Sequence, residues 1–225
     1  MIVFGKNVFN ELKNNAKSIK KVYLSKSFHD KEIIDFIKAS GIKYETVDSR
    51  RLDEMESGNH QGIIAVINEY EYKEIDSILN EDVIVILDHL EDPHNFGAII
   101  RTCEAAGIKG IIIPKDRSVS VNGTVMKTSS GALEYVSIVA VSNLVNTIKK
   151  LKDNNYFIYA AEADGVNYKA VDYHNKCVLV IGSEGNGISR LVRDNSDVIV
   201  SIPMQGKVNS LNASVAAGIL IYGIK

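Results

Sequence analysis

Three segments in the second half of the chain combine small residues with polar ones, and each follows a run of apolar residues. The first contains Asn95 and, six positions later, Arg101. An arginine among small apolar residues is costly to bury unless it faces a cleft or has an anionic partner. Arg101 is therefore a candidate for binding an anion, although a surface or structural role explains its position equally well. Asn95 is expected to cap the helix that starts there, through its side-chain oxygen.

The second segment is a glycine-rich turn that runs from Gly182 to Gly187. Glycines permit positive φ angles and let a ligand approach the backbone closely. The turn fits neither common phosphate-binding pattern: its glycines are spaced G-x-x-G-x-G rather than G-x-G-x-x-G, and Ile188 stands where a Walker motif requires lysine. Because Glu184 lies inside the turn, a neutral or cationic ligand fits better than an anionic one.

The third segment runs from Ile202 through a polar loop into a helix of small residues. The loop contains Ser210 and Asn212, and the helix contains Ala213, Ala216, Ala217 and Gly218. Small side chains would let this helix approach another helix closely. A packing helix with a polar cap explains the segment without any ligand, and for this segment alone we favour that explanation.

Short apolar runs alternate with helical patterns along the whole chain, which is typical of an α/β protein. Strands are expected at 22–24, 63–67, 83–87, 110–113, 136–140, 157–161, 178–181 and 198–202, and helices at 7–16, 30–39, 96–106, 144–154 and 211–222. The apolar runs of the second half are nearly continuous Val and Ile, as expected for a parallel sheet that helices cover on both faces. Ligands of such sheets bind beyond the carboxyl ends of the strands.

The acidic stretch Glu69–Asp82 has no glycine and no strong apolar period, so we interpret it as a connection between two domains. The predicted organisation is a small α/β domain at residues 1–70, a linker at 71–81 and a larger α/β domain at 82–225. The three segments that carry candidate chemistry all belong to the larger domain.

Charge and composition exclude some classes of protein. The net charge of −2 argues against a strongly basic nucleic-acid coat, but residues 1–31 and 95–152 each carry a net charge of +5, against −11 for residues 44–92. The positive stretches could form a face for nucleic acid, although ordinary scatter of surface charge is the simpler explanation. Cys103 and Cys177 belong to no ligand cluster, so no metal is expected. Buried reduced thiols, with no membrane span and no signal peptide, indicate a cytoplasmic protein.

Taken together, the three segments resemble motifs 1, 2 and 3 of the SpoU (TrmH) family of RNA 2′-O-ribose methyltransferases, within the SPOUT superfamily. The matching patterns are N-x-G-A-x-x-R-T from Asn95, G-S-E-G-x-G from Gly182 and I-P-M…N-S-L-N-x-S-x-A-A-G from Ile202. The joint match is far more specific than any one segment. The departures are small: Cys103 and Ala213 stand where the family often has Ala and Val.

The resemblance implies an S-adenosyl-L-methionine site in a deep trefoil knot, and a homodimer. The knot would leave little room for a side chain near Gly206. The residues expected to hold the cofactor are Ala160, Ala161, Gly182, Glu184, Gly187, Ile202, Met204, Ser210, Leu211 and Ala213.

The resemblance also implies a catalytic set, which comprises Asn95, Arg101, Glu184, Ser210 and Asn212. Guanidinium is rarely deprotonated in proteins, so we favour Arg101 as a clamp on the phosphate next to the acceptor ribose rather than as a general base. Asn95 would orient the ribose or phosphate, and Glu184 would orient Arg101 or the acceptor loop. Ser210 and Asn212 would complete the pocket.

The first domain gives a shorter match, through Gly5-Lys-Asn-Val and His60-Gln-Gly-Ile-Ile-Ala. These resemble the N-terminal RNA-binding extension of the RlmB-type members, which has an L30e-like fold. The residues expected to contact RNA are Lys6, Lys13, Lys17, Lys20, Lys21 and His60, together with Arg101. For His60, a packed structural role is an equally good explanation.

The leading hypothesis is methylation of a guanosine 2′-hydroxyl in 23S ribosomal RNA, a structured RNA. The alternative within the same class is tRNA or another ribosomal RNA nucleotide. A non-catalytic RNA-binding protein with a relic knot is a different class, and the complete set of catalytic motif residues argues against it. A nucleotide-binding oxidoreductase is opposed by the failed dinucleotide pattern.

Overall fold

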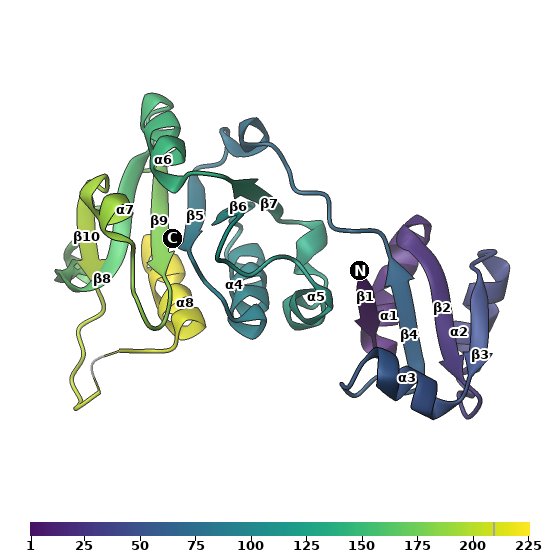
Figure 1. Cartoon of the computed structure of the whole chain (residues 1–225). Coiled ribbons are helices and arrows are strands. Elements are labelled where there is room, and N and C mark those ends of the chain that lie inside the picture. The colour runs from purple at the N-terminus through teal and green to yellow at the C-terminus, as the bar shows by residue number, and fades with distance from the viewer. Residues whose placement is uncertain (209) are drawn as a thin grey trace. The chain divides into compact units, whose positions relative to one another are not determined.

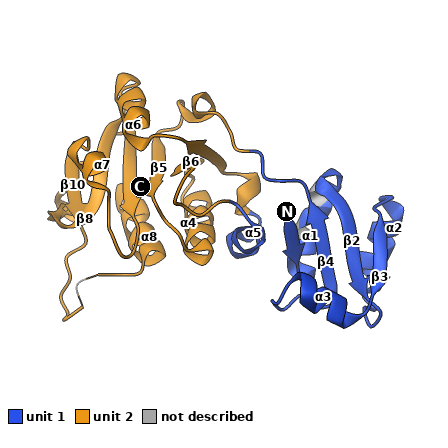
Figure 2. Ribbon diagram, viewed as in Figure 1, with its two compact units in different colours: residues 1–71, 121–131 blue, residues 72–120, 132–225 orange. Residues whose placement is uncertain are grey.

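Figure 1 shows the computed structural model of the protein, which describes residues 1–208 and 210–225; Asn209 of the third motif lies outside them. The chain divides into two compact units, which Figure 2 distinguishes by colour. The first unit contains residues 1–71 and 121–131, and the second contains residues 72–120 and 132–225. The segment 121–131 lies inside the predicted second domain, and no sequence feature separates it from its neighbours.

The first unit is built on a mixed sheet with the strand order β1-β4-β2-β3. The strands are β1 (Ile2–Phe4), β2 (Ile19–Ser25), β3 (Tyr44–Val47) and β4 (Ile63–Ile67), and the helices are α1 (Lys6–Leu12), the 3-10 helix η1 (Lys13–Ser18), α2 (Lys31–Ala39), α3 (Ser49–Met55) and α5 (Gly123–Ser129). Helix α2 shows why these elements form: Asp30 caps its first turn by accepting from Ile33 N, and Ile33 and Ile37, one turn apart, are buried in the core.

In the described part of the second unit, six strands form one parallel sheet with the order β10-β8-β9-β5-β6-β7. The strands are β5 (Val83–Asp88), β6 (Gly110–Pro114), β7 (Ser137–Val141), β8 (Phe157–Asn167), β9 (Cys177–Gly182) and β10 (Val198–Ser201). The predicted parallel sheet is therefore confirmed. All residues of β5 and β6 are buried, as their continuous apolar runs require.

Helices cover this sheet: α4 (Pro93–Ala105), α6 (Leu144–Asp153), α7 (Arg190–Asp194) and α8 (Ala213–Ile224), with 3-10 turns η2 (Ile75–Ile78), η3 (Ala132–Glu134) and η4 (Tyr168–Ala170). Helices α6 and α7 pack on the sheet through Ile148, Leu151 and Val192. Helix α8 contacts both α4 and β9 (Figure 1). None of the helices in the described residues is long and apolar enough to cross a membrane.

Helix α4 begins two residues earlier than its predicted cap. Asp92 is the N-cap, with its side chain accepting from His94 N at 2.6 Å, and Pro93 occupies the first turn, where its missing N–H is harmless. The expectation that Asn95 caps this helix is therefore wrong. Because Asp92 takes that role, the buried amide of Asn95 is left to make another contact.

Strand β8 continues past the end of its pairing with β9. The last pair in that ladder is Ala161 with Ile181, and the partners of consecutive β10 residues jump from Ala160 to Val166. Residues 162–165 therefore lie outside the regular pairing with β9 and β10, at the carboxyl edge of the sheet. This segment contains the acidic residues Glu162 and Asp164.

The glycine-rich turn after β9 folds tightly back on itself. Ser183 N donates to Gly187 O at 3.0 Å, and Gly187 N donates to Ser183 O at 2.9 Å. A Cβ atom at Gly182 would clash with the backbone of Gly187, whereas a Cβ at Gly206 would meet no described atom within 4 Å. The expectation of a crowded Gly206 is therefore wrong, and the steric restriction lies at Gly182.

This restriction makes a prediction for stability. Gly182→Ala should lower the free energy of unfolding by about 1–3 kcal/mol or more, because the obstructing atoms are backbone atoms and the turn must shift. Gly185→Ala is the matched control in the same turn, since its Cβ meets no described atom within 4 Å. Chemical denaturation measures both variants. If Gly182→Ala is as stable as the control, the close contact is not a real constraint.

Candidate functional site

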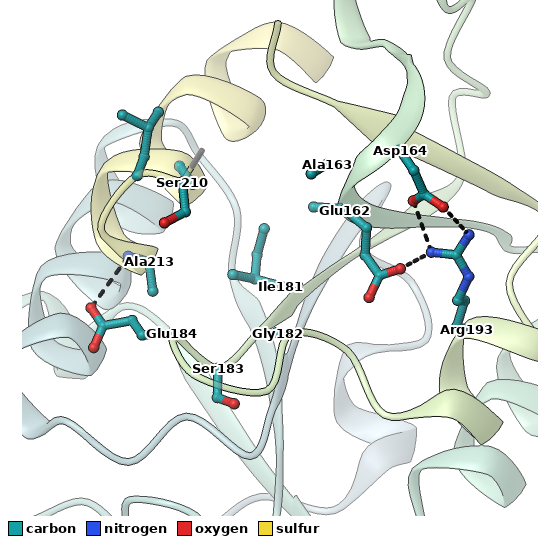
Figure 3. Close-up of a pocket in the computed structure, with 14 residues that line it drawn as sticks. Glu162, Ala163, Asp164, Ile181, Gly182, Ser183, Glu184, Arg193, Ser210 and Ala213 are labelled. Carbon is teal, nitrogen blue, oxygen red and sulfur yellow. Dashed lines mark hydrogen bonds and ion pairs between the residues drawn. The ribbon is translucent and has the colours of Figure 1, made fainter. Parts of the chain in front are cut away.

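A cavity of about 420 Å³ opens at the carboxyl edge of the parallel sheet (Figure 3). One side is the turn after β9 with the start of α8, and the other is the segment of β8 that leaves the ladder. A second cavity, of about 450 Å³, shares Ala161, Glu162, Ala163, Ser210, Leu211 and Ala216 with the first. The two cavities are thus adjoining parts of one depression.

Most of the residues expected to hold a cofactor line this depression. The first cavity is lined by Ala161, Gly182, Glu184, Gly187, Ser210, Leu211 and Ala213. Ile202 and Met204 line the second. Ala160 is the exception among these positions, because it is fully buried within β8 and lines neither cavity.

Glu184 brings two of the other predicted catalytic residues together at the cavity. Its Oε1 atom accepts from Asn95 Nδ2 at 2.6 Å and from Asn212 Nδ2 at 2.8 Å. The backbone N–H of Ala213 also points at this oxygen, at 3.4 Å. Hydrogen bonds to a carboxylate are stronger than those between neutral groups, so this cluster is firmly held.

Asn212 is fixed from both ends of its amide. Its Oδ1 atom caps α8 by accepting from Ser214 N at 3.0 Å and Val215 N at 3.3 Å, and it also accepts from Ser214 Oγ at 2.6 Å. Its Nδ2 atom donates to Glu184. The start of α8 and the glycine-rich turn are therefore locked together beside the cavity.

Arg101 is not part of this cluster. It is exposed on α4, and within residues 1–208 and 210–225 its side chain makes no hydrogen bond or ion pair. Of the two roles that the resemblance left open for Glu184, orienting Arg101 or orienting the acceptor loop, the contact with Asn212 favours the second. Ser210 is also exposed and lines both cavities. The exposed guanidinium of Arg101 is available to an anion from solution.

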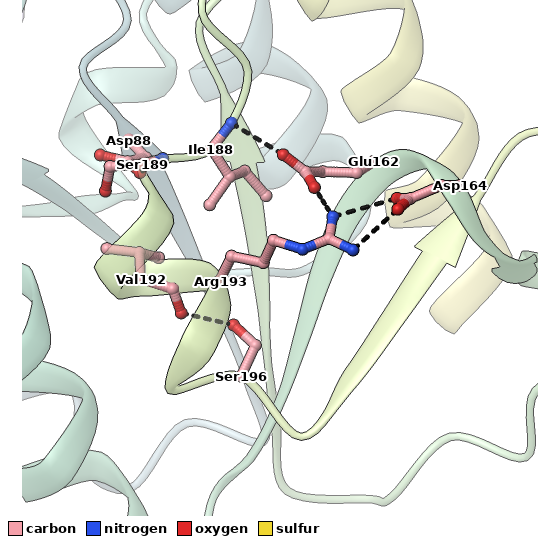
Figure 4. A network of polar contacts seen from close by, with 8 residues as sticks. All are labelled: Asp88, Glu162, Asp164, Ile188, Ser189, Val192, Arg193 and Ser196. Carbon is pink, nitrogen blue, oxygen red and sulfur yellow. Dashed lines mark hydrogen bonds and ion pairs between the residues drawn. The ribbon is translucent and has the colours of Figure 1, made fainter.

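A second polar network forms the opposite wall of the cavity and was not predicted (Figure 4). Arg193 of α7 forms a bidentate pair with Asp164, at 3.0 and 2.8 Å, and an ion pair with Glu162. Glu162 Oε1 also accepts from Ile188 N at 3.3 Å, just after the glycine-rich turn. The only trace of this network in the sequence is Glu-x-Asp after a predicted strand, and nothing there points to its arginine partner.

The buried carboxylate of Asp88 holds the backbone just after the glycine-rich turn. Asp88 lies at the end of β5, in register with Gly182 of β9. Its Oδ2 accepts from Ser189 N at 2.7 Å, and its Oδ1 lies 2.5 Å from His89 Nδ1. Asp88 thus fixes the residues that follow the turn, while Glu184 holds the turn itself to α4 and α8.

In the first unit, three of the lysines expected to contact RNA are engaged in ion pairs: Lys6 with Asp30, Lys13 with Glu32 and Lys21 with Glu45. Lys17 and Lys20 are exposed and have no ion-pair partner in the part of the chain that the structure describes. Exposed ion pairs are weak, so Lys6 and Lys21 remain available to a polyanion together with Lys17 and Lys20, whereas the side chain of Lys13 is only 17% exposed.

His60 has a structural role in the first unit. Its Nδ1 accepts from Gly62 N at 3.0 Å, so the proton is on Nε2, which donates to Asp53 Oδ1 at 3.0 Å. Both ring nitrogens are therefore engaged in fixing the turn that leads into β4. Of the two explanations that the sequence left open for His60, the structure favours packing.

The two cysteines are buried and unpaired, as predicted. Burial raises the pKa of Cys103 to about 12 and that of Cys177 to about 11. Both thiols are therefore protonated at neutral pH and unsuited to nucleophilic chemistry. No group of three or more potential metal ligands occurs among the residues that the structure describes.

Comparison with known proteins places this geometry in a family. Residues 82–222 match the model described as the SpoU rRNA Methylase family, and residues 2–73 match the model described as RNA 2′-O ribose methyltransferase substrate binding. A Staphylococcus haemolyticus protein classed in the TrmH family of tRNA/rRNA methyltransferases is 39% identical over 235 residues, which cover 100% of this chain and 94% of that protein. Bacillus subtilis YacO, with the same description, is 38% identical over 233 residues, or 99% of this chain and 94% of YacO.

The fold agrees with that of solved members. The SpoU methyltransferase AviRb from Streptomyces viridochromogenes, solved in complex with the cofactor AdoMet, gives a TM-score of 0.81 at 22% identity and covers 100% of this chain and 88% of AviRb. Sequence and fold thus lead to the same conclusion. The chain belongs to the SpoU (TrmH) family of RNA methyltransferases.

Proposed function

We propose that this protein transfers a methyl group from S-adenosylmethionine to the 2′-hydroxyl of a guanosine ribose in 23S ribosomal RNA. The observation that carries the proposal is the Asn95–Glu184–Asn212 cluster at the wall of the cavity. It joins all three family motifs at one place. The YacO-type relatives are described as tRNA/rRNA methyltransferases, and the N-terminal match concerns 2′-O ribose methylation of RNA.

The cavity suits S-adenosylmethionine in size and in charge. Its volume of about 420 Å³ is within the range of about 300–1,000 Å³ that is usual for small-molecule sites. Its polar lining includes Glu162 and Glu184, which oppose an anion and favour a cation. The glycines at 182 and 187 let a ligand lie against the backbone. The predicted cofactor residues that line the depression would make those contacts.

We extend the proposal to topology and assembly. The strand end at Ala160–Ala161, the turn at Gly182–Gly187 and the loop of residues 202–208 and 210–213 would form a trefoil knot. Residues 1–70 would be an L30e-like RNA-binding domain, joined by the linker 71–81 to the methyltransferase domain at 82–225. The exposed apolar side chains of Val215 and Tyr222 on α8 support a homodimer through this helix.

In the proposed mechanism the Asn95–Glu184–Asn212 cluster positions the acceptor ribose, and the positive charge of Arg101 stabilises the negative charge that develops on the 2′-oxygen. The cofactor supplies the methyl group as a sulfonium substituent. Glu184 lines the cavity and fixes Asn212 and Asn95, and Asn95 orients the acceptor ribose or its phosphate. Arg101, exposed and without an ion-pair partner among the described residues, clamps the phosphate beside the ribose and lowers the pKa of its 2′-hydroxyl. A phosphate oxygen or water then accepts the proton.

The substrate assignment predicts the outcome of a methylation assay. Purified protein with tritiated S-adenosylmethionine should label unmodified 23S rRNA and leave 16S rRNA and tRNA unlabelled, and nuclease digestion should place the label in 2′-O-methylguanosine. Labelling of tRNA alone would overturn the substrate assignment and keep the reaction. Label on a base instead of a ribose would overturn the reaction itself.

The proposed role of Arg101 predicts a difference between two substitutions. Arg101→Ala should lower kcat/KM for RNA by about 100-fold or more, through loss of the charge next to the acceptor. Arg101→Lys should also be strongly impaired, because an ammonium group lacks the planar fork that binds phosphate through two bonds. Cofactor affinity should not change in either variant. Near-full activity of Arg101→Lys would refute the clamp.

The shared hydrogen bond of Asn95 and Glu184 predicts non-additive kinetics. Asn95→Ala and Glu184→Ala should each lower kcat, by about 10- to 100-fold, and the double variant should be little worse than the more impaired single one, because both act through one contact. Glu104→Ala, an exposed acid on the same helix α4, is the control and should retain activity. Strictly additive losses would show that the two residues act separately.

A further inference from the structure

The residues that line the first cavity carry more negative than positive charge, and three of the charged ones, Glu162, Asp164 and Arg193, form one wall of it. Among the described residues that line it, Glu162, Asp164 and Glu184 are acidic and Arg193 is basic, so the formal charge is −2. Arg193 pairs with both Glu162 and Asp164 and can neutralise only one of them. One carboxylate of this wall therefore remains uncompensated, and Glu184 adds a second across the cavity (Figure 3).

A cofactor that donates a methyl group from sulfur changes its charge in the reaction. The carbon–sulfur bond breaks with its electron pair left on sulfur, a carbon–oxygen bond forms, and the hydroxyl proton leaves to solvent or phosphate. At neutral pH S-adenosylmethionine has a net charge of +1, and its product S-adenosylhomocysteine has a net charge of 0. A negative wall attracts the first and has little net attraction for the second.

We infer that the Glu162–Asp164–Arg193 wall selects the cofactor by charge, holding the cationic methyl donor and favouring release of the neutral product. The inference rests on the proposed function, in that it takes S-adenosylmethionine as the ligand of this cavity. The wall is well placed for this task, because Glu162 is anchored to Ile188 N beside the glycine-rich turn and its side chain is 21% exposed. Solvent screens it less than Asp164, whose side chain is 67% exposed.

The competing explanation is that the Glu162–Asp164–Arg193 network acts only as a structural brace, which stabilises the glycine-rich turn without selecting a ligand. A brace would support any ligand of the cavity equally, whatever the charge of that ligand. Charge selection instead makes the ratio of the two affinities depend on the charge of the wall. The two explanations therefore predict different effects of each substitution on binding. A brace predicts the same change in affinity for every ligand, whereas charge selection predicts a change that depends on the charge of the ligand.

Isothermal titration calorimetry of the full chain tests this without any RNA. The ligands are S-adenosylmethionine, S-adenosylhomocysteine and sinefungin, in which a charged amine replaces the sulfonium centre. The unmodified protein should bind both cations more tightly than S-adenosylhomocysteine. Glu162→Gln, which keeps an acceptor for Ile188 N, should reduce this preference by about three- to tenfold, and the more screened Asp164→Asn should reduce it less.

Arg193→Gln provides a test of opposite sign, because it makes the wall more negative and should increase the preference for the two cations. Asp76→Asn is the matched control: it removes one exposed acid that pairs with Lys150 and lines neither cavity. It should leave the preference unchanged. Thermal unfolding shows whether each variant is folded. If Glu162→Gln does not fold, Asp164→Asn remains as the test, because the Asp164 side chain is exposed.

Two results would overturn the inference. One is an equal loss of affinity for all three ligands in Glu162→Gln and Asp164→Asn, which is the result expected of a brace. The other is equal affinity of the unmodified protein for the methyl donor and its product. Absence of any binding by S-adenosylmethionine would overturn the proposed cofactor, and the inference with it.

Discussion

A single carboxylate oxygen holds together the parts of this site that are most remote in sequence. Glu184 Oε1, in the turn after β9, accepts amide protons from Asn95 in α4 and from Asn212 at the start of α8. Asn95 is buried, so its amide would lose a needed partner if the carboxylate were removed, at a cost of about 1–3 kcal/mol. Because Asn212 also caps α8 through its Oδ1 atom, its contact with Glu184 connects the start of that helix to the glycine-rich turn.

The parallel sheet supplies the frame on which this contact depends. Register pairs Asp88 of β5 with Gly182 of β9, so the loop before α4 and the glycine-rich turn emerge side by side. Strand β8 then departs from β9 after Ala161 and sends Glu162 and Asp164 to the far side of the cavity. The cavity thus lies between two polar networks, one built on asparagine amides and the other on an arginine.

Local patterns in the sequence predict the parallel sheet, because buried parallel strands are continuous apolar runs, and they make the glycine-rich turn visible as a motif. The cofactor residues that line the depression followed from the resemblance to the family, and other lining residues, such as Glu162 and Asp164, were not predicted. The cap of α4 was misassigned to Asn95 because two residues in this loop have capping side chains, and only packing decides in favour of Asp92. The pair of Arg193 with Asp164 joins residues 29 positions apart, which no local pattern specifies. The short edge strands β1 and β3 and the placement of residues 121–131 depend on tertiary contacts in the same way.

The cavity between the two networks should bind the methyl donor while Glu184 keeps its two asparagine partners. The decisive measurement is a crystal structure of the full chain with S-adenosylmethionine. Cofactor density is expected between the turn at Gly182–Gly187 and residues 161–164, with the hydrogen bonds of Glu184 to Asn95 and Asn212 intact. Cofactor bound elsewhere would show that this cavity is not its site, and loss of those hydrogen bonds in the complex would show that the cluster does not position the reacting groups.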